Sequence, residues 1–423
     1  MIACFGLGLL ALLWIAWLMQ AILSAIQVNK LSREVLHERR ASFKAYQPSA
    51  AVIVPFKGLE PDLSTCVRSL CNQEYKQYRL LFVVESQDDP AYAVIKNEIA
   101  NYPHRSVKIL IAGTAGHDQG QKVHNQLAAI AALDDRDQVW IFADSDAVPG
   151  RSWLSEMVGP LRHESIGMTT GYRWLVPRGA KGHKPTMAAQ FGSVINSSIA
   201  CSYRRNRLSH AWGGAMAIRS STARKGNLKF RLAGALTDDY QFSALCHDLG
   251  KRLYFVPHCL VATSTNFDWP ALFSFGRRQY LITRVYAPKL FIAALLCTSL
   301  YAVGCLTAWT ALVHGMVFNF QSDNWIWPAM VLIHVFLANQ VRAYYRRLVV
   351  ERIFGPNIRD ALAPSLKIDQ WYTPCWMSLH CLIILLASFG QIITWRGIRY
   401  RLLGPQRVQR LGSGDTLISA NSV

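Results

Sequence analysis

The chain has 423 residues, of which 51% are hydrophobic and 17% are charged. This composition is too apolar for a soluble enzyme, and because the apolar residues gather in a few long segments it indicates membrane segments joined to a soluble domain. The net charge of +19 suits an anionic membrane surface or an anionic substrate. We expect no nucleic-acid partner, because the basic residues flank the apolar segments and no nucleic-acid-binding motif is present. These flanking residues are Lys30, Arg33, Arg39 and Arg40, then Arg342, Arg346 and Arg347, and finally Arg396, Arg399 and Arg401.

An apolar segment opens the chain, from Ile2 to Ile26. It exceeds the roughly 20 residues that a helix needs to cross a bilayer. A cleaved signal peptide is the alternative, but no basic region precedes the segment and basic residues follow it. We therefore expect a transmembrane helix over residues 1–28. The positive-inside rule then places the N-terminus outside and the following domain in the cytosol.

Short apolar strands alternate with helices over residues 45–265, which predicts an α/β domain with a mostly parallel sheet and a nucleotide at its carboxyl edge. The expected strands or extended segments are 51–54, 80–84, 107–112, 139–143, 167–176, 215–219 and 253–256. The expected helices are 62–70, 90–100, 123–133, 186–201 and 239–249. The ten cysteines form no Cys-x-x-Cys pair, so we expect small buried hydrophobes in a reducing compartment rather than zinc ligands or disulfides.

Residues 266–289 include the basic amphipathic stretch Trp269 to Tyr286, which suits a helix lying in the membrane interface, with a buried connector as the alternative. Residues 290–395 hold about three apolar segments, and residues 396–423 are expected to be a basic tail with a disordered end. Three spans after the domain would place that basic tail outside, against the positive-inside rule. Either one segment is re-entrant or interfacial, or residues 290–320 do not form a single span. The three segments are Leu290 to Val313, Ile326 to Leu337 with flanks, and Met377 to Trp395.

Two carboxylates, Asp144 and Asp146, directly follow the buried strand expected over residues 139–143. At the mouth of a sheet crevice, such a pair can hold a hard divalent cation through oxygen ligands, and the cation can hold a diphosphate. A solvated strand-end turn is the alternative for this pattern taken alone. Further acids end strands or open helices at Glu85, at Asp88 and Asp89, and at Asp238 and Asp239.

Taken together in order and spacing, these motifs resemble those of family-2 glycosyltransferases, and within them the ceramide glucosyltransferases of family 21. The resemblance covers roughly residues 50–288 and the arrangement of apolar segments around them. It implies a GT-A (Rossmann-like) catalytic domain, a UDP-sugar donor and Mg²⁺ or Mn²⁺ as cofactor. The motifs are Pro55-Phe56-Lys57-Gly58, Glu85 to Ala91, Gly120 to Leu127, Asp144-Ser145-Asp146 and Thr237-Asp238-Asp239-Tyr240.

The resemblance also implies roles for individual acids. Glu85, Asp88 and Asp89 would contact uracil and ribose, with Glu85 standing where many relatives have aspartate. Asp144 would lie near the diphosphate and the sugar, and both Asp144 and Asp146 are candidates for the metal site. Asp239 would be the general base that takes the proton from the lipid hydroxyl, giving inversion in a single displacement. Asp238 would raise the pKa of its neighbour by like-charge repulsion, or would instead be a helix N-terminal acid.

The chain departs from the family in the expected interface helix, where relatives carry (Gln/Arg)-x-x-Arg-Trp. Here the aligned stretch ends in Arg277-Arg278-Gln279-Tyr280, so Arg277 or Arg278 must supply the cation. We expect these four residues, together with Lys57 and Lys122, to contact the UDP-sugar, although Lys122 is equally well explained as a solvated lysine. The stretch Trp212-Gly213-Gly214 is a candidate acceptor loop, or a buried tryptophan beside a turn.

We therefore expect an integral membrane, inverting, non-processive hexosyltransferase that moves a hexose from UDP to a lipid hydroxyl, with glucose favoured as the sugar and ceramide as the acceptor. Diacylglycerol or a hopanoid-type lipid is the nearest alternative acceptor. A processive polysaccharide synthase is a second alternative, and a non-catalytic nucleotide-binding scaffold or transporter is a third. We expect the catalytic domain at the cytosolic face of a bacterial inner membrane, or of a Golgi or endoplasmic reticulum membrane in a eukaryote.

Overall fold

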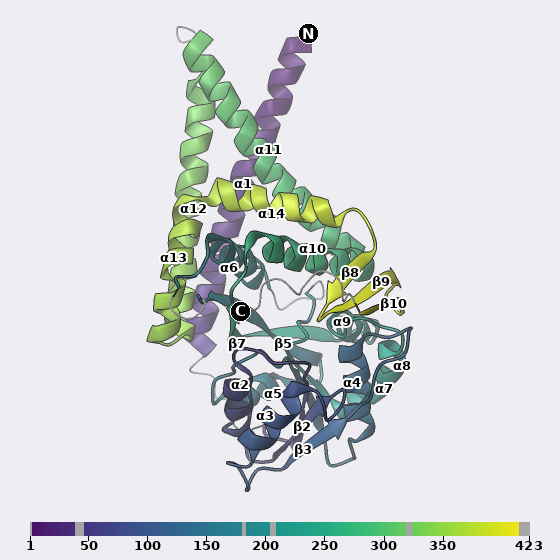
Figure 1. Cartoon of the computed structure of the whole chain (residues 1–423). Helices are drawn as coiled ribbons and strands as arrows, with labels where there is room; N and C mark the ends of the chain where they lie inside the picture. Colours follow the sequence, from purple (N-terminus) through teal and green to yellow (C-terminus); the bar gives the residue numbers. More distant parts are fainter. Residues whose placement is uncertain (1, 39–45, 180–182, 204–208, 319–323, 414–423) are drawn as a thin grey trace.

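The computed structural model describes residues 2–38, 46–179, 183–203, 209–318 and 324–413 (Figure 1). Three long helices extend from one end of an α/β domain: α1 (Ile2–Glu38), α11 (Pro288–Phe318) and α12 (Ile326–Ile353). The basic residues Arg39 and Arg40 and the expected disordered end over residues 414–423 lie outside the described ranges.

A seven-stranded sheet forms the centre of the domain, in the order β3-β2-β1-β4-β6-β5-β7. Strands β1 to β4 are mutually parallel, β5 and β7 are parallel, and β6 is antiparallel to both of its neighbours. The predicted α/β domain with a mostly parallel sheet is therefore confirmed. The strands are β1 (Ala50–Pro55), β2 (Tyr78–Val84), β3 (Val107–Ile111), β4 (Val139–Ala143), β5 (Ile166–Pro177), β6 (Ala215–Arg219) and β7 (Arg252–Thr265).

Helices cover both faces of this sheet, which explains why its central strands are continuous apolar runs rather than alternating ones. Within β1, Val52 and Val54 belong to one buried cluster and Ile53 to another on the opposite face. The first cluster includes residues of α2 (Leu63–Cys71), α3 (Pro90–Ile99) and α5 (Trp153–Val158), which continues into the 3-10 helix η2 (Gly159–Arg162). The second includes residues of α4 (Gln121–Ala131), α7 (Ser220–Lys225), α8 (Leu228–Leu232) and α9 (Asp239–Asp248).

Strand order reverses at β1, which pairs with β2 on one side and with β4 on the other. In open α/β sheets the crevice beyond the carboxyl ends of the strands at such a reversal is where ligands bind. Lys57 follows β1 and Asp144 follows β4, so the topology brings both to the edge of this crevice.

The three long helices meet the length and apolar composition that crossing a membrane requires, over Gly8–Leu36, Pro288–Phe318 and Ile326–Ile353. Large apolar side chains on them face outward: Leu12 in α1 is 65% exposed, and Leu306 in α11 is also 65% exposed. Exposed leucines along three long helices are stable only if lipid surrounds them, so the membrane character expected from the composition is confirmed.

The third apolar segment after the domain forms a helix that is shorter than a typical membrane span. Its helix, α14 (Thr373–Ala387), has 15 residues, which is fewer than the roughly 17 to 25 that cross a bilayer. Figure 1 shows α14 lying across the axes of the long helices, beside α10 (Trp269–Tyr286). This length and orientation favour the interfacial alternative weighed from the sequence, which stays a prediction, and α10 has the bounds expected for the interface helix.

Residues 396–413 do not form the basic tail that the sequence had suggested. Together with the end of the third apolar segment they form an antiparallel sheet of β8 (Ile392–Trp395), β9 (Ile398–Gly404) and β10 (Arg407–Ser413). Its inward-facing residues Ile398, Tyr400, Leu402 and Val408 join the buried cluster of α10 and α14. Two more helices complete the fold: α6 (Met187–Ala200), as expected, and α13 (Pro356–Trp371), which the sequence pattern had not indicated.

Candidate active site

One cavity of about 1340 Å³ extends from the carboxyl edge of the sheet to the membrane helices. Asp144, Asp146 and Asp239 all line it, although they lie far apart along the chain. Apolar residues of α1, α10, α11 and α14 also line it, among them Leu23, Ile282, Ala294 and Met377. The acids therefore share one hollow with apolar side chains of these helices.

Lys122 ties two of the predicted acids together. Its Nζ lies 2.8 Å from Asp144 Oδ1 and 3.2 Å from Asp238 Oδ1. Burial opposes its protonation, but the two carboxylates outweigh burial and raise the pKa of Lys122 above its usual value. Lys122 therefore stays charged and lines the cavity, so the solvated-lysine alternative is wrong.

Asp238 is fully buried, and its carboxylate also accepts a hydrogen bond from Gln126 Nε2 at 2.5 Å. It occupies the N-cap position of α9 without capping that helix through its side chain. The Cβ of an added side chain at Gly213 would lie 2.6 Å from Asp238 Oδ1, so only glycine lets the backbone pass this close. Asp238 is thus a structural member of the Lys122 cluster and does not line the cavity.

Asp239 opens α9 and lines the cavity. Its Oδ1 accepts hydrogen bonds from Thr237 Oγ1 at 2.9 Å and from the Tyr240 backbone N–H at 2.8 Å. Burial, reinforced by the neighbouring charge of Asp238, raises the pKa of Asp239 to about 6. A partly buried carboxylate with a pKa near neutrality is suited to accept a proton from a hydroxyl.

The Asp144–Asp146 pair has the properties expected of a two-carboxylate metal site. Burial and the charge of Asp144 raise the pKa of Asp146 to about 6, and Asp146 Oδ1 is buried without a hydrogen-bond partner. A buried carboxylate oxygen without a partner fits a cation ligand. Within the described residues no group of three or more His, Cys, Asp or Glu side chains converges, so the chain itself offers two carboxylates at most at this position.

The acids expected at the nucleoside are not among the described residues that line the cavity. Glu85 forms an ion pair with Lys57, which does line the cavity, and accepts a hydrogen bond from Thr114. Asp89 caps α3 and accepts the Gly58 backbone N–H at 3.0 Å, while the neighbouring Asp88 is exposed. Contact of Glu85, Asp88 and Asp89 with uracil and ribose stays a prediction, because the structure places only Lys57 of this group on the wall.

The interface helix α10 contributes Arg278, Gln279 and Tyr280 to the cavity. Arg277 does not belong to this group: its guanidinium donates to the carbonyls of Phe389 at 2.8 Å and Ile392 at 3.1 Å, beyond the end of α14. Consecutive helical residues point about 100° apart, and the side chain of Arg277 is directed to these carbonyls instead of to the cavity. Of the two candidates left open by the motif, Arg278 is the cation that lines the site.

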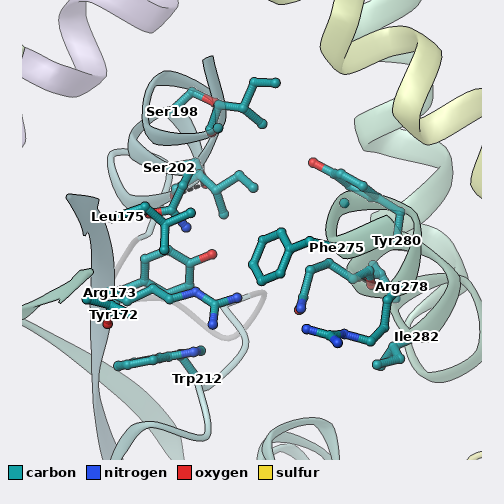
Figure 2. Close-up of a pocket in the computed structure, with 18 of the residues that line it drawn as sticks. Tyr172, Arg173, Leu175, Ser198, Ser202, Trp212, Phe275, Arg278, Tyr280 and Ile282 are labelled. Carbon is teal, nitrogen blue, oxygen red and sulfur yellow. Dashed lines mark hydrogen bonds between the residues drawn. The ribbon is translucent and has the colours of Figure 1, made fainter. Parts of the chain in front are cut away.

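Sequence reasoning missed Arg173, in β5. Its guanidinium carbon lies 4.9 Å from the ring centre of Phe275, and that of Arg278 lies 5.4 Å from the same ring. Figure 2 shows the two side chains pointing into the cavity from opposite sides. Burial, together with the charge of Arg173, lowers the pKa of Arg278 to about 10. Two like charges this close in a partly buried hollow favour a bound anion.

The candidate acceptor loop also borders the cavity, through Trp212 and Gly213. Trp212 is 6% exposed and packs edge-on against Tyr172, with ring centres 5.6 Å apart. The Cβ of an added side chain at Gly214 would meet the Trp212 ring at 2.3 Å, so the glycine leaves room for this ring beside the backbone. Trp212 is therefore buried beside a turn and also lines the cavity, and contact of this loop with the acceptor stays a prediction.

The chain matches a family description over most of its length. Residues 12–408 match the model of Glycosyl transferase family 21. Ceramide glucosyltransferase of Komagataella phaffii is 28% identical over 160 residues, which make up 37% of this chain and 31% of that protein. Ceramide glucosyltransferase of Candida albicans is 30% identical over 117 residues, 24% of this chain and 22% of that protein. Each aligned segment spans less than a third of the relative's own length.

Solved structures show more distant similarity. The mannosyltransferase PcManGT from Pyrobaculum calidifontis, in complex with GDP-Man and Mn²⁺, is 13% identical with a TM-score of 0.46, over 90% of this chain and 97% of that chain. Glucosyl-3-phosphoglycerate synthase from Mycobacterium tuberculosis is 16% identical with a TM-score of 0.35, over 57% of this chain and 80% of that chain. The family match runs from α1 to β10 and confirms the resemblance predicted from the motifs. The chain belongs to glycosyl transferase family 21.

Proposed function

We propose that this protein is an inverting, non-processive transferase that moves a hexose, with glucose favoured, from a UDP-sugar to the hydroxyl of a membrane lipid. The observation that carries the proposal is the single cavity that joins Asp144, Asp146 and Asp239 to the apolar surfaces of α1, α11 and α14. A lipid that enters between these helices can present its polar end to Asp239 while its chains stay in the bilayer. The ceramide glucosyltransferases among the relatives favour ceramide as the acceptor, with diacylglycerol or a hopanoid-type lipid as alternatives.

In this proposal Asp239 is the general base. It accepts the proton of the lipid hydroxyl as that oxygen attacks the anomeric carbon from the side opposite UDP, and the bond from that carbon to the diphosphate breaks. A raised pKa makes Asp239 a stronger base than an exposed aspartate. The positive charges of Arg173 and Arg278 stabilise the negative charge that develops on the departing diphosphate.

Asp144 and Asp146 would hold the divalent cation, Mg²⁺ or Mn²⁺, that the family resemblance implies. Mg²⁺ in particular is often bound by one or two carboxylates plus substrate phosphates and water, which suits a site where the chain supplies two carboxylates. When bound, such a cation neutralises charge on the diphosphate. Lys122 holds Asp144 at the cavity wall and adds a fixed positive charge beside it.

We propose a cytosolic location for the catalytic domain. With α1, α11 and α12 as the spans, an external N-terminus places the domain, α13, α14 and the basic strands β9 and β10 on one and the same side. That side carries Arg396, Arg399 and Arg401, so the positive-inside rule is satisfied and the conflict posed by a fourth span disappears.

The Asp239→Asn variant tests the proposed function. We expect it to bind UDP and to lose turnover by about 10³-fold, because a missing general base costs roughly 10² to 10⁴ in rate. UDP release from UDP-glucose would be measured in mixed micelles that contain ceramide, diacylglycerol or a hopanoid, with the glycolipid product identified by mass spectrometry.

A matched control is Asp248→Asn, at the other end of α9, where the carboxylate is 60% exposed and pairs with Arg231. This control should keep the turnover of the unaltered protein. Turnover retained in Asp239→Asn would contradict the assignment of the base. Failure of every lipid to stimulate UDP release from any UDP-hexose would contradict the proposed reaction itself.

A further inference from the structure

The C-terminal sheet forms part of the wall of the donor end of the cavity. Trp395, Arg396, Ile398 and Tyr400 line the same hollow as Lys57, Glu60, Gln121 and Asp144. The latter four residues come from the carboxyl edge of the parallel sheet and the start of α4, where a nucleotide binds in folds of this type. The sheet β8–β10 therefore stands opposite the edge that would hold the donor.

Polar contacts hold the C-terminal sheet against the loops around this edge. The backbone N–H of Arg410 donates to the His117 carbonyl at 2.7 Å, and the Arg410 guanidinium donates to the Ala115 carbonyl at 3.2 Å. On the far side, Gln241 Nε2 donates to the Pro405 carbonyl at 2.7 Å. Because both ends of the sheet are held, the tip of the β8–β9 hairpin has a defined position at the cavity.

That tip has an unusual residue for its backbone conformation. Trp395 pairs with Ile398, and the two residues between them have positive φ: 52° at Arg396 and 75° at Gly397. A two-residue hairpin of this kind favours Asn-Gly, because asparagine tolerates the left-handed region and an arginine does not. Residues with a strained backbone concentrate at ligand-binding sites. The geometry of the turn alone therefore does not explain why an arginine occupies this position.

The surroundings of Arg396 indicate that this arginine binds an anion. Its guanidinium forms an ion pair with Glu60, and the two side chains are 39% and 15% exposed. The ion pair uses Nη1 of the guanidinium, and a guanidinium has further N–H groups that can donate to a second, anionic partner. Lys57 and Lys122, the other cations at this end, are already paired with Glu85 and Asp144.

We propose that the β8–β9 hairpin is a donor-binding element, and that Arg396 contacts the diphosphate of the nucleotide, with Glu60 holding the arginine at the cavity mouth until the donor arrives. Guanidinium groups match phosphate geometry through paired N–H donors. Trp395 lies beside the other arginine of the site, with the Arg278 guanidinium 5.6 Å from its ring centre, so the hairpin borders the anion site of Arg173 and Arg278 as well. This inference rests on the proposed use of a UDP-sugar.

The test compares binding of UDP and of uridine to the full chain in detergent, measured by titration calorimetry at fixed salt and Mg²⁺ concentrations. Arg396→Asn removes the charge and relieves the turn, so the melting temperature should stay equal or rise. We expect the Kd of UDP to increase about tenfold, as for the loss of one charged hydrogen bond, and the Kd of uridine to stay the same. Arg399→Asn is the matched control: Arg399 is exposed on β9, and it is absent from the cavity wall formed by the described residues.

Glu60→Gln separates the proposal from a purely structural ion pair. If Arg396 serves only that pair, losing either partner should have the same effect on UDP affinity. If Arg396 binds the diphosphate, Glu60→Gln should leave UDP affinity equal or higher, because it frees the arginine and removes a nearby negative charge. Equal weakening in the two variants would overturn the proposal.

Two further results would also overturn the proposal: UDP affinity of Arg396→Asn equal to that of the unaltered protein, or a loss of uridine affinity as large as the loss for UDP. Failure of the unaltered protein to bind UDP at all would overturn the proposed function and this inference together. If the unaltered protein binds UDP and Arg396→Asn binds it equally well, only the proposed role of the hairpin would be overturned.

Discussion

At the scale of single residues, the pKa of Asp239 predicts the pH dependence of the reaction. The general base must be ionised, and burial beside Asp238 raises the pKa of Asp239 to about 6. We therefore expect kcat/KM to fall at least about tenfold for each pH unit below 6, since this parameter reports the ionisation of the free enzyme. Asp146, whose pKa is also raised to about 6, would steepen the decline. An activity profile that stays flat down to pH 5 would speak against both carboxylates.

We also expect the ionised carboxylate of Asp239 to lower the free energy of unfolding of the protein. An acid whose pKa is raised in the folded state contributes stability only when protonated, and that contribution is lost as the pH rises from its ordinary value near 3.8 through about 6. We expect Asp239→Asn to unfold at a higher temperature than the unaltered protein at pH 7.5, by an amount that shrinks towards pH 4. Thermal unfolding in detergent at several pH values would measure this. A lower melting temperature at pH 7.5 would mean that the charge is well compensated.

At the scale of the element, α10 divides two functions between adjacent arginines. Arg277 donates to carbonyls beyond the end of α14, whereas Arg278 faces the cavity. We expect Arg277→Met to reduce the free energy of unfolding by about 1–3 kcal/mol and to leave UDP affinity unchanged, because hydrogen bonds to charged groups contribute that much. Arg278→Met should have the opposite profile, with a Kd for UDP that rises about tenfold.

Titration calorimetry and thermal unfolding on the same two preparations would check this pair of predictions. Each variant serves as the control for the other, since both lose one guanidinium from the same helix. A loss of UDP affinity in Arg277→Met that matches that in Arg278→Met would show that α10 acts on the donor through its position and not through one side chain.

At the scale of the whole molecule, the number of membrane spans determines on which side of the membrane each terminus lies. Three of the described helices are long and apolar enough to cross a membrane, and an odd number of spans places the two termini on opposite sides. We expect reporters fused to the N-terminus and to the C-terminus to show opposite locations, with the C-terminal one cytosolic. Membrane-impermeant labelling of intact cells would check the result. Termini on the same side would restore a fourth span, with α14 as the candidate.

The amino-acid sequence by itself determined the elements whose pattern is local. Continuous apolar runs such as residues 139–143 marked strands buried on both faces, and the basic amphipathic stretch from Trp269 to Tyr286 marked α10 with its observed bounds. The family also followed from sequence, because its motifs are short and keep their order along the chain. These features depend on neighbours within a few residues, which periodicity and motif spacing capture.

Only the tertiary structure decided which side chains share the cavity. Asp238 and Asp239 are adjacent in sequence, yet one is sealed against Lys122 and the other lines the hollow, because the first turn of α9 points them apart. The C-terminal sheet was mistaken for the end of a membrane span and a basic tail. Ile398, Tyr400 and Leu402 do alternate with arginines, but the strands are short and the arginines also suit a tail that follows a membrane span. Arg173 and Arg396 gained their roles from contacts across more than a hundred residues of chain, which no local pattern encodes.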